Sequence, residues 1–249
     1  MKTNTTRFSD RVEDYIKYRP KYPVQMLELF RKEIGLHTDS IIADIGSGTG
    51  ISSEPFVANG NNVFGVEPNT KMRQAAEQFF SNSANHFSIN GTAEQTGLTE
   101  NSIDVIFAGQ AFHWFDKGKA KLEFSRILKK TGHIVLGWNV RSEKTDFQKE
   151  YDKILRETIP EYSIVTHKNI SDQEIRDFFS PRESVSEYLV NAQILDLEGL
   201  KGRLKSSSYC PKSGQEYESL INKLTDLFTR YESNGLIEFA YDTHLYWCR

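Results

Sequence analysis

Short apolar runs alternate with amphipathic helical segments along the first 140 residues of this 249-residue chain. The runs SIIADIG, NNVFGVEP, HFSIN, SIDVIFAG and GHIVLGWN are rich in β-branched and aromatic residues and predict buried strands. Between them, NTKMRQAAEQFF predicts a helix with Asn69 as its N-cap and an apolar face formed by Met72, Ala75, Ala76 and Phe79. Because alternating strands and helices require right-handed crossovers, this half predicts a mainly parallel α/β sheet.

A further helix is predicted by KGKAKLEFSRILKK, whose inward side chains are Ala120, Phe124, Ile127 and Leu128. After Arg141 the pattern changes to two expected surface helices, an extended run, a strong amphipathic helix at 217–231 and the alternating GLIEFAYDTHLYW. We therefore expect a Rossmann-like, doubly wound sheet of seven strands that ends in an antiparallel strand. We expect one domain over 1–249, with an N-terminal helical cover at 1–34 and a helical insertion or lid at 141–184, before the sixth strand.

The composition argues against several classes of function. With 31 basic and 34 acidic residues the formal net charge is −3, which gives no electrostatic case for nucleic acid or an anionic membrane. No apolar run approaches the ~20 residues that span a bilayer. The two cysteines form neither a disulfide framework nor a zinc pattern. We expect a cytoplasmic protein without metal and with a small-molecule partner; the sequence specifies no oligomeric state.

The turn after the first strand, IIADIGSGTG, is the most informative local motif. In a doubly wound sheet such a turn places backbone amides at the edge where ligands bind. A dinucleotide fingerprint would need glycine at position 51, where Ile51 stands, because the spacing here is G-x-G-x-G. Asp44 would also repel a pyrophosphate, but it would tolerate an amine or a sulfonium. Glu67 follows Gly46 by 21 positions, near the ~20 expected for an acid that holds ribose hydroxyls.

These residues resemble those of a known family. ADIGSGTG resembles the first motif of class I S-adenosylmethionine (SAM) dependent methyltransferases, and VEPN resembles their acidic ribose-binding position. GTAEQTGL, residues 91–98, resembles the loop beside the adenine, and IDVIFAGQAFHWFD, residues 103–116, resembles the fourth-strand motif. HWFD and the N-terminal YIKYRPKYP are similar to the small-molecule subgroup of trans-aconitate methyltransferase-like, or methyltransferase type 11, proteins. The resemblance follows motif order along the chain and is thin over 142–211.

The resemblance implies SAM as cofactor, S-adenosylhomocysteine (SAH) as product and no metal. It implies that the segment around Arg19 covers the cofactor, with the guanidinium on the methionyl carboxylate. The alternative is a surface strap whose tyrosines pack on the domain. The expected cofactor contacts are Arg19, Asp44, Gly46, Ser47, Gly48, Glu67, Pro68, Ala93, Glu94 and Gln110.

Residues 110–115 leave the fourth strand at the edge where the reactive methyl group must lie. We take Gln110, His113 and Trp114 as the candidate catalytic residues, with His113 as a general base for an acceptor that must lose a proton. The aromatic run is equally typical of core packing, and a lone histidine there can be structural. The candidate acceptor-binding residues are Tyr18, Trp138, Arg141 and Tyr209.

The expected function is methyl transfer from SAM to a small-molecule acceptor, with a carboxylate as one candidate, by in-line displacement. Two alternatives remain open from the sequence: an NAD-dependent oxidoreductase and a SAM-binding protein without catalysis. The glycine spacing and Asp44 speak against the first.

Overall fold

The structure is a computed structural model, which describes residues 12–160, 162 and 171–248. The expected N-terminal cover and lid therefore lie partly outside the described residues. The helices and strands, in chain order, are α1 (Val12–Tyr18), α2 (Gln25–Ile34), β1 (Ile41–Ile45), α3 (Glu54–Ala58), β2 (Asn62–Val66), α4 (Thr70–Phe79), β3 (His86–Ile89), β4 (Ile103–Gly109), a 3-10 helix (Phe112–Trp114), α5 (Lys117–Ile127), β5 (Leu128–Arg141), α6 (Asp146–Thr158), α8 (Asp172–Phe179), β6 (Ser184–Leu195), α9 (Leu197–Lys205), α10 (Gln215–Tyr231) and β7 (Ile237–Cys248).

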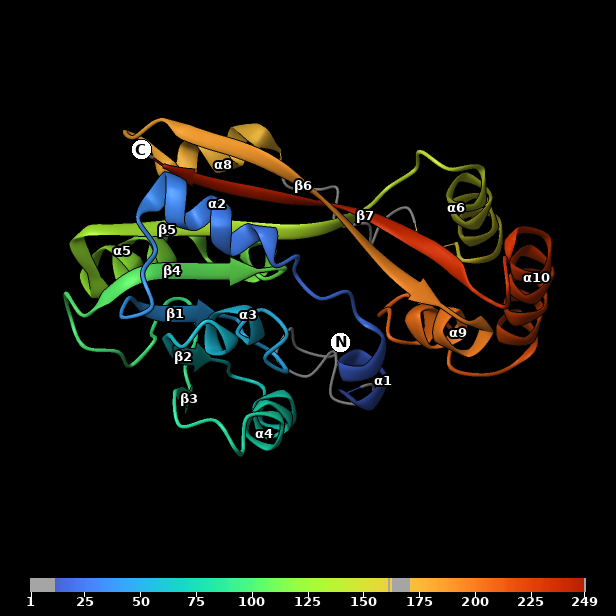
Figure 1. The fold of residues 1–249 in the computed structure, drawn as a ribbon, viewed down its shortest axis with the longest axis horizontal. Coiled ribbons are helices and arrows are strands. Elements are labelled where there is room, and N and C mark those ends of the chain that lie inside the picture. Colours follow the sequence, from blue (N-terminus) through green and yellow to red (C-terminus); the bar gives the residue numbers. More distant parts are fainter. Residues whose placement is uncertain (1–11, 161, 163–170, 249) are drawn as a thin grey trace.

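Seven strands of the described chain form one sheet in the order β3-β2-β1-β4-β5-β7-β6. The first five strands are parallel, and β7 runs antiparallel to both β5 and β6. The order reverses between β1 and β4, so the carboxyl ends of these strands flank the crevice in which doubly wound folds bind ligands. The predicted Rossmann-like fold with a terminal antiparallel strand is confirmed (Figure 1).

Helices cover both faces of this sheet. On one face α2 packs Met26 and Phe30 over Ile42 and Phe107 of the central strands. On the other face α5 and α8 bury their apolar sides against β1, β4 and β5. Ala120, Phe124 and Ile127 of α5 are fully buried, as the apolar spacing of that segment predicts. The central strands are therefore covered on both sides, and their carboxyl ends are left as the place for a site.

A second hydrophobic core lies beyond the end of this sheet. There α6, α9 and α10 pack around the far halves of β6 and β7, which extend past the parallel strands (Figure 1). We call α6, α9, α10 and these strand ends the second lobe. Its core includes Leu155, Leu200, Leu224 and Phe239, all buried. The lobe stands opposite the carboxyl ends of the parallel strands, so it can supply the far wall of a cavity.

The chain segment that includes α1 and the residues up to Tyr22 joins the two parts; we call residues 12–22 the strap. Asn191 Nδ2 donates a hydrogen bond to the Lys21 carbonyl oxygen at 2.7 Å, and Gln193 Nε2 donates to the Tyr18 carbonyl oxygen at 3.1 Å. Arg19 Nη2 donates to the Ser206 carbonyl oxygen at 2.9 Å, just after α9. The strap is thus hydrogen-bonded to β6 and to the second lobe.

The structure corrects two details of the expected helices. The helix expected through residue 130 ends at Ile127, because Leu128 is extended and pairs with Ile103 of β4. Phe79 does not share the buried face of α4: it is 46% exposed, and the neighbouring Phe80 is buried instead, stacked on His86. Asn69 caps α4 as expected, with its side-chain oxygen accepting from the Lys71 and Met72 N–H groups.

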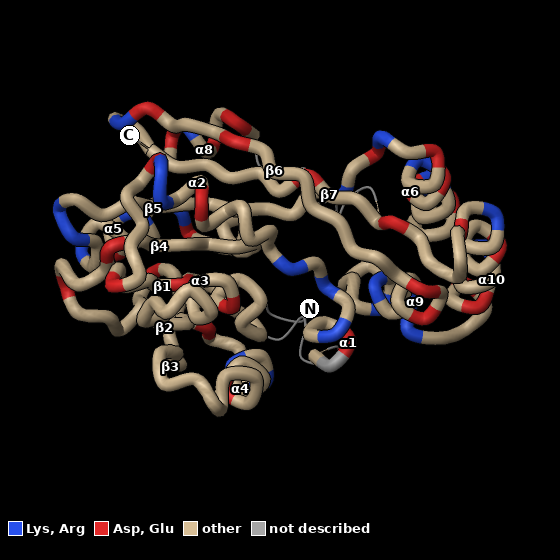
Figure 2. Tube along the Cα trace, viewed as in Figure 1, with Lys and Arg blue, Asp and Glu red and all other residues tan. Residues whose placement is uncertain are grey.

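Two global expectations can be compared with the described part of the chain. None of its helices combines the length and apolar character that a membrane crossing needs. Basic and acidic residues are interspersed along the chain trace (Figure 2).

Candidate active site

One cavity of about 320 Å³ runs from the carboxyl ends of β1, β2 and β4 to the second lobe. One end of the cavity is formed by the glycine turn and the residues that follow β2, and the opposite end by the strap, β5 and α9. Of the candidate residues from the sequence, those that line it are Arg19, Gly46, Ser47, Gly48, Glu67, Pro68, Ala93, Glu94, Gln110, His113, Trp114, Trp138, Arg141 and Tyr209. Residues from seven separate stretches of sequence are therefore brought to one site.

The glycine turn follows β1 directly and requires glycine at its first position. Gly46 has φ +72°, and a Cβ there would lie 2.6 Å from the Cβ of Ala111. The Gly46 and Ser47 N–H groups donate to the Val66 carbonyl oxygen at 2.8 and 3.2 Å, which fixes the turn to the end of β2. A backbone bent in this way leaves space for a ligand beside it.

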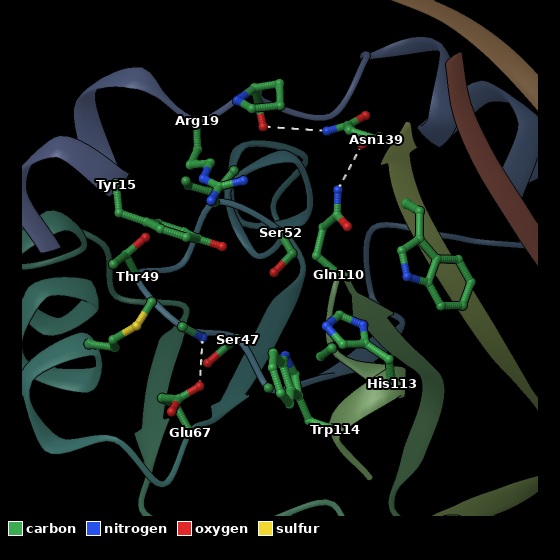
Figure 3. Close-up of a pocket in the computed structure, with 18 of the residues that line it drawn as sticks. Tyr15, Arg19, Ser47, Thr49, Ser52, Glu67, Gln110, His113, Trp114 and Asn139 are labelled. Atoms are coloured by element: carbon green, nitrogen blue, oxygen red, sulfur yellow. Dashed lines mark hydrogen bonds between the residues drawn. The ribbon is translucent and has the colours of Figure 1, made fainter. Parts of the chain in front are cut away.

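Glu67 is placed at the end of β2 against this turn. Its Oε2 accepts from the Gly48 N–H at 3.0 Å, and its Oε1 accepts from the Asn69 N–H at 2.7 Å (Figure 3). Burial raises the pKa of Glu67, and the two N–H donors oppose that shift. Each carboxylate oxygen can accept a second hydrogen bond, so the side chain can still receive two hydroxyl groups from a ribose.

Asp44 lies beneath the turn and does not line the cavity. It is fully buried, and its Oδ2 accepts from the Ser52 and Ser53 hydroxyls at 2.7 and 2.6 Å. Its Oδ1 has no hydrogen-bond partner among the described residues. Burial, opposed by the two serine hydroxyls, raises the pKa of Asp44 to about 6. The carboxylate thus stiffens the segment after the turn and carries an unmet capacity for a donor or a cation.

The raised pKa of Asp44 predicts a pH-dependent stability. Because the folded pKa of about 6 exceeds the ordinary 3.8, the stabilisation is present below pH 3.8 and is lost as pH rises through 6. We expect the free energy of unfolding of the ligand-free protein to fall by about 1–2 kcal/mol between pH 5 and 8 from this group. Asp44→Asn should remove that decline in urea titrations, whereas the exposed Asp39→Asn should retain it. Equal pH profiles for the wild type and Asp44→Asn would contradict the account.

The residues that follow β4 form an aromatic side of the cavity. Gln110 has φ +56°, and its Nε2 donates to the Asn139 carbonyl oxygen at 3.0 Å, so its side chain is held across the cavity (Figure 3). His113 and Trp114 line the cavity from the 3-10 helix. Phe112 instead packs in the core, edge-on to Phe178 at 4.8 Å. The aromatic run is therefore divided between the site and the core.

The loop after β3 contributes the buried Ala93 and the side chain of Glu94. Glu94 Oε1 accepts from the Asp116 N–H at 2.8 Å, which ties this loop to the start of α5. Trp138 of β5 lines the cavity, and its Nε1 has no hydrogen-bond partner among the described residues. These groups shape the space beyond the glycine turn.

The arginine candidates differ in their partners. Arg141 is ion-paired with Asp152, donates to the Tyr162 hydroxyl and lies over the Tyr151 ring at 5.1 Å. Arg19 lies over the Tyr15 ring at 4.9 Å, and its Nε has no partner among the described residues. Burial, followed by the nearby Arg203 charge, lowers the pKa of Arg19. Arg141 is thus a neutralised cation, whereas Arg19 is not.

Tyr18 is not among the residues that line the cavity. Its ring lies against α9, where a Cβ added at Gly202 would be 2.2 Å from it, and this contact explains why the strap docks there. The sequence reasoning missed Arg203 of α9 and Tyr162, which do line the cavity. An arginine in the glycine-containing LEGLKGRLK was the available signal, but the weak apolar pattern there predicted no helix.

The residues present fit SAM. The Gly46 turn leaves the backbone open, Glu67 can accept from ribose hydroxyls, and the buried Arg19 Nε lacks an acceptor that a methionyl carboxylate would provide. No group of three or more His, Cys, Asp or Glu side chains within the described ranges could hold a metal ion.

Comparison with known proteins agrees with this geometry. Residues 43–136 match the family described as "Methyltransferase domain". An uncharacterized methyltransferase of Mycobacterium tuberculosis is 29% identical over 243 residues, which cover 92% of this chain and 90% of the relative.

Two solved structures share the fold. A protein from Anabaena variabilis named as a methyltransferase has a TM-score of 0.66 at 21% identity and covers 93% of this chain and 98% of its own. A protein from Methanococcus maripaludis named as SAM-dependent has a TM-score of 0.58 at 20% identity, covering 74% and 90%. The family match over residues 43–136, the names of the relatives and the shared fold bear out the resemblance to class I SAM-dependent methyltransferases. SAM is the cofactor that this class implies.

Proposed function

We propose that this protein transfers the methyl group of SAM to a carboxylate oxygen of a small-molecule acceptor. The observation that carries the proposal is the charge of the cavity wall opposite the glycine turn: Arg19 and Arg203 line it, and neither is ion-paired with a described carboxylate. Buried cations without counterions favour an anionic ligand. An acceptor large enough to be a folded nucleic acid would not enter a space of about 320 Å³.

The chain's own residues have limited chemistry to perform in this reaction. When bound, SAM supplies an electrophilic methyl group on a positively charged sulfur. A carboxylate is already anionic near neutral pH, so no residue has to remove a proton from it. Gln110, held by the Asn139 carbonyl, and the aromatic side chains of Trp114 and Phe115 narrow the cavity and exclude water. The cavity wall that carries Arg19 and Arg203 orients the acceptor.

The proposal is tested by incubating the protein with tritium-labelled SAM and an acidic metabolite fraction. We expect label to appear in products that release volatile methanol on mild alkali treatment, because carboxyl methyl esters hydrolyse under those conditions. Label that stays bound after alkali would indicate an ether, amine or carbon acceptor and would overturn the carboxylate assignment.

The effect of replacing His113 on kcat distinguishes a carboxylate acceptor from a hydroxyl acceptor. If the acceptor needs no base, His113→Ala should lower kcat by less than about 10-fold, whereas loss of a general base costs about 100- to 10,000-fold. The matched control is the exposed His37→Ala, which should leave kcat unchanged. A loss of 1000-fold or more with an acceptor shown to be a carboxylate would contradict this prediction.

A further inference from the structure

Arg203 is built into the cavity wall with a fixed orientation. It projects from α9 and is 8% exposed. Its Nε donates to the Tyr241 hydroxyl at 2.8 Å, and its Nη1 donates to Ser207 Oγ at 3.0 Å. The Tyr241 hydroxyl donates in turn to Gln193 Oε1 at 2.8 Å. Tyr241 and Gln193 therefore hold one edge of the guanidinium, and they are positioning residues for it.

The charge of Arg203 has no counterion in the described part of the chain. Its hydrogen-bond partners among the described residues are neutral hydroxyl groups, in contrast to Arg141, which is paired with Asp152. Arg19 faces the same cavity with a neutral partner, the Ser206 carbonyl, and is close enough for its pKa to be lowered by the Arg203 charge. Two buried cations near one another are costly unless an anion binds between or beside them.

Arg19 and Arg203 are far apart in the sequence, but both line the cavity where the strap meets the second lobe. Arg19 belongs to the strap and Arg203 to the second lobe, and basic residues of the strap run toward α9 in the chain trace (Figure 2). Figure 3 shows Arg19 above the side of the cavity that holds Ser47 and Glu67. Since Arg19 is expected to bind the cofactor's carboxylate, a second carboxylate is needed for Arg203.

We propose that Arg203 binds a carboxylate of the methyl acceptor. The subsite at Arg203, here called the seat, is separate from the subsite for the cofactor's own carboxylate. The inference rests on the proposed function and adds the residue that selects the acceptor. The Nη2 of Arg203 has no partner within the described residues, so the guanidinium retains N–H groups for an anion. Arg141 is less suited to bind the acceptor's carboxylate, because Asp152 already neutralises the charge of Arg141.

The seat also distinguishes the acceptor from its product when the bound carboxylate is the one methylated. In the transfer, a carboxylate oxygen forms a bond to the methyl carbon, the carbon–sulfur bond breaks and its electron pair stays on sulfur. The anion becomes a neutral ester, and Arg203 again lacks a counterion. Binding at this seat therefore weakens as the reaction proceeds, which favours release of the product.

The test uses acetate as the probe, in protein saturated with SAH so that the cofactor's carboxylate seat is filled. At constant ionic strength, 50 mM sodium acetate replacing chloride should raise Tm by about 2–4 °C, the shift expected for a site with a Kd of about 10 mM on a chain of this size. Methyl acetate, which has the same shape without the charge, should leave Tm unchanged.

Variants locate the site. Arg203→Met should lose the acetate shift, Arg203→Lys should retain a reduced one, and Arg230→Met, which removes an exposed guanidinium paired with Glu150, should respond as the wild type does. If Arg203→Met does not fold, the Arg203→Lys response and the methyl acetate comparison decide. An acetate shift that methyl acetate or Arg203→Met reproduces, or no shift at all, would overturn the proposal.

Two further results separate the sources of the anion. If Arg203→Met weakens SAH binding 10-fold or more, the seat belongs to the cofactor and the inference is wrong, while the proposed function stands. If alkali-labile methyl esters form but acetate has no effect, only the seat fails. If SAH does not bind the wild type, the proposed function itself fails.

Discussion

Replacing Glu67 with alanine should weaken SAH binding about 100- to 10,000-fold. Two charge-assisted hydrogen bonds to the ribose, each worth ~1.5–3 kcal/mol, are lost. The structure adds a second reason: the carboxylate accepts from the Gly48 and Asn69 N–H groups, so its removal also loosens the turn. Isothermal titration calorimetry measures the change directly.

The matched control for Glu67→Ala is Glu77→Ala, an exposed carboxylate on α4 that accepts from Ser88. It should bind SAH as the wild type does. An unchanged dissociation constant in a folded Glu67→Ala protein would remove Glu67 from the cofactor site and with it the role assigned to the end of β2.

Gly46→Ala should both destabilise the protein and abolish cofactor binding. Its φ of +72° costs a side-chain residue about 1–2 kcal/mol, and overpacking against Ala111 adds about 1–3 kcal/mol. Chemical denaturation should therefore show a loss of about 2–5 kcal/mol. Because Gly46 and Ala111 both line the cavity, any shift that relieves the contact changes the shape of the cavity wall, so SAH binding falls with it.

Gly60→Ala separates these two contributions. Gly60 also has a positive φ, +95°, but a Cβ there meets nothing within 4 Å. It should lose only about 1–2 kcal/mol and bind SAH normally. Equal destabilisation by the two substitutions would show that the contact with Ala111 carries no cost.

The parts of the site that are local in sequence could be predicted from the sequence. The glycine turn, Asp44 and Glu67 lie within about one strand–helix–strand unit, where spacing along the chain sets position in space. The parallel strands could also be predicted, because each is formed by one short apolar run of the sequence. The one-residue error at Phe79 arose because α4 ends there, and the next residue turns into the core.

The acceptor end could not be predicted in the same way. Arg203 reaches the cavity only because β6 and β7 extend beyond the parallel sheet and carry α9 with them. That placement depends on long-range pairing, and α9 itself has two glycines and a weak apolar face. Arg141 was a candidate acceptor-binding residue, and its ion pair with Asp152 of α6 could not be predicted because nothing in the spacing of the sequence pairs them.

The central claim is that the bend after β1, opposite Glu67, holds an adenosine whose tail carries sulfur rather than a pyrophosphate. Calorimetric titration of the wild type with SAH and, separately, with NAD tests it most directly. We expect one SAH bound per chain, lost in Gly46→Ala, and no heat of binding with NAD. Saturable NAD binding together with no response to SAH would contradict it.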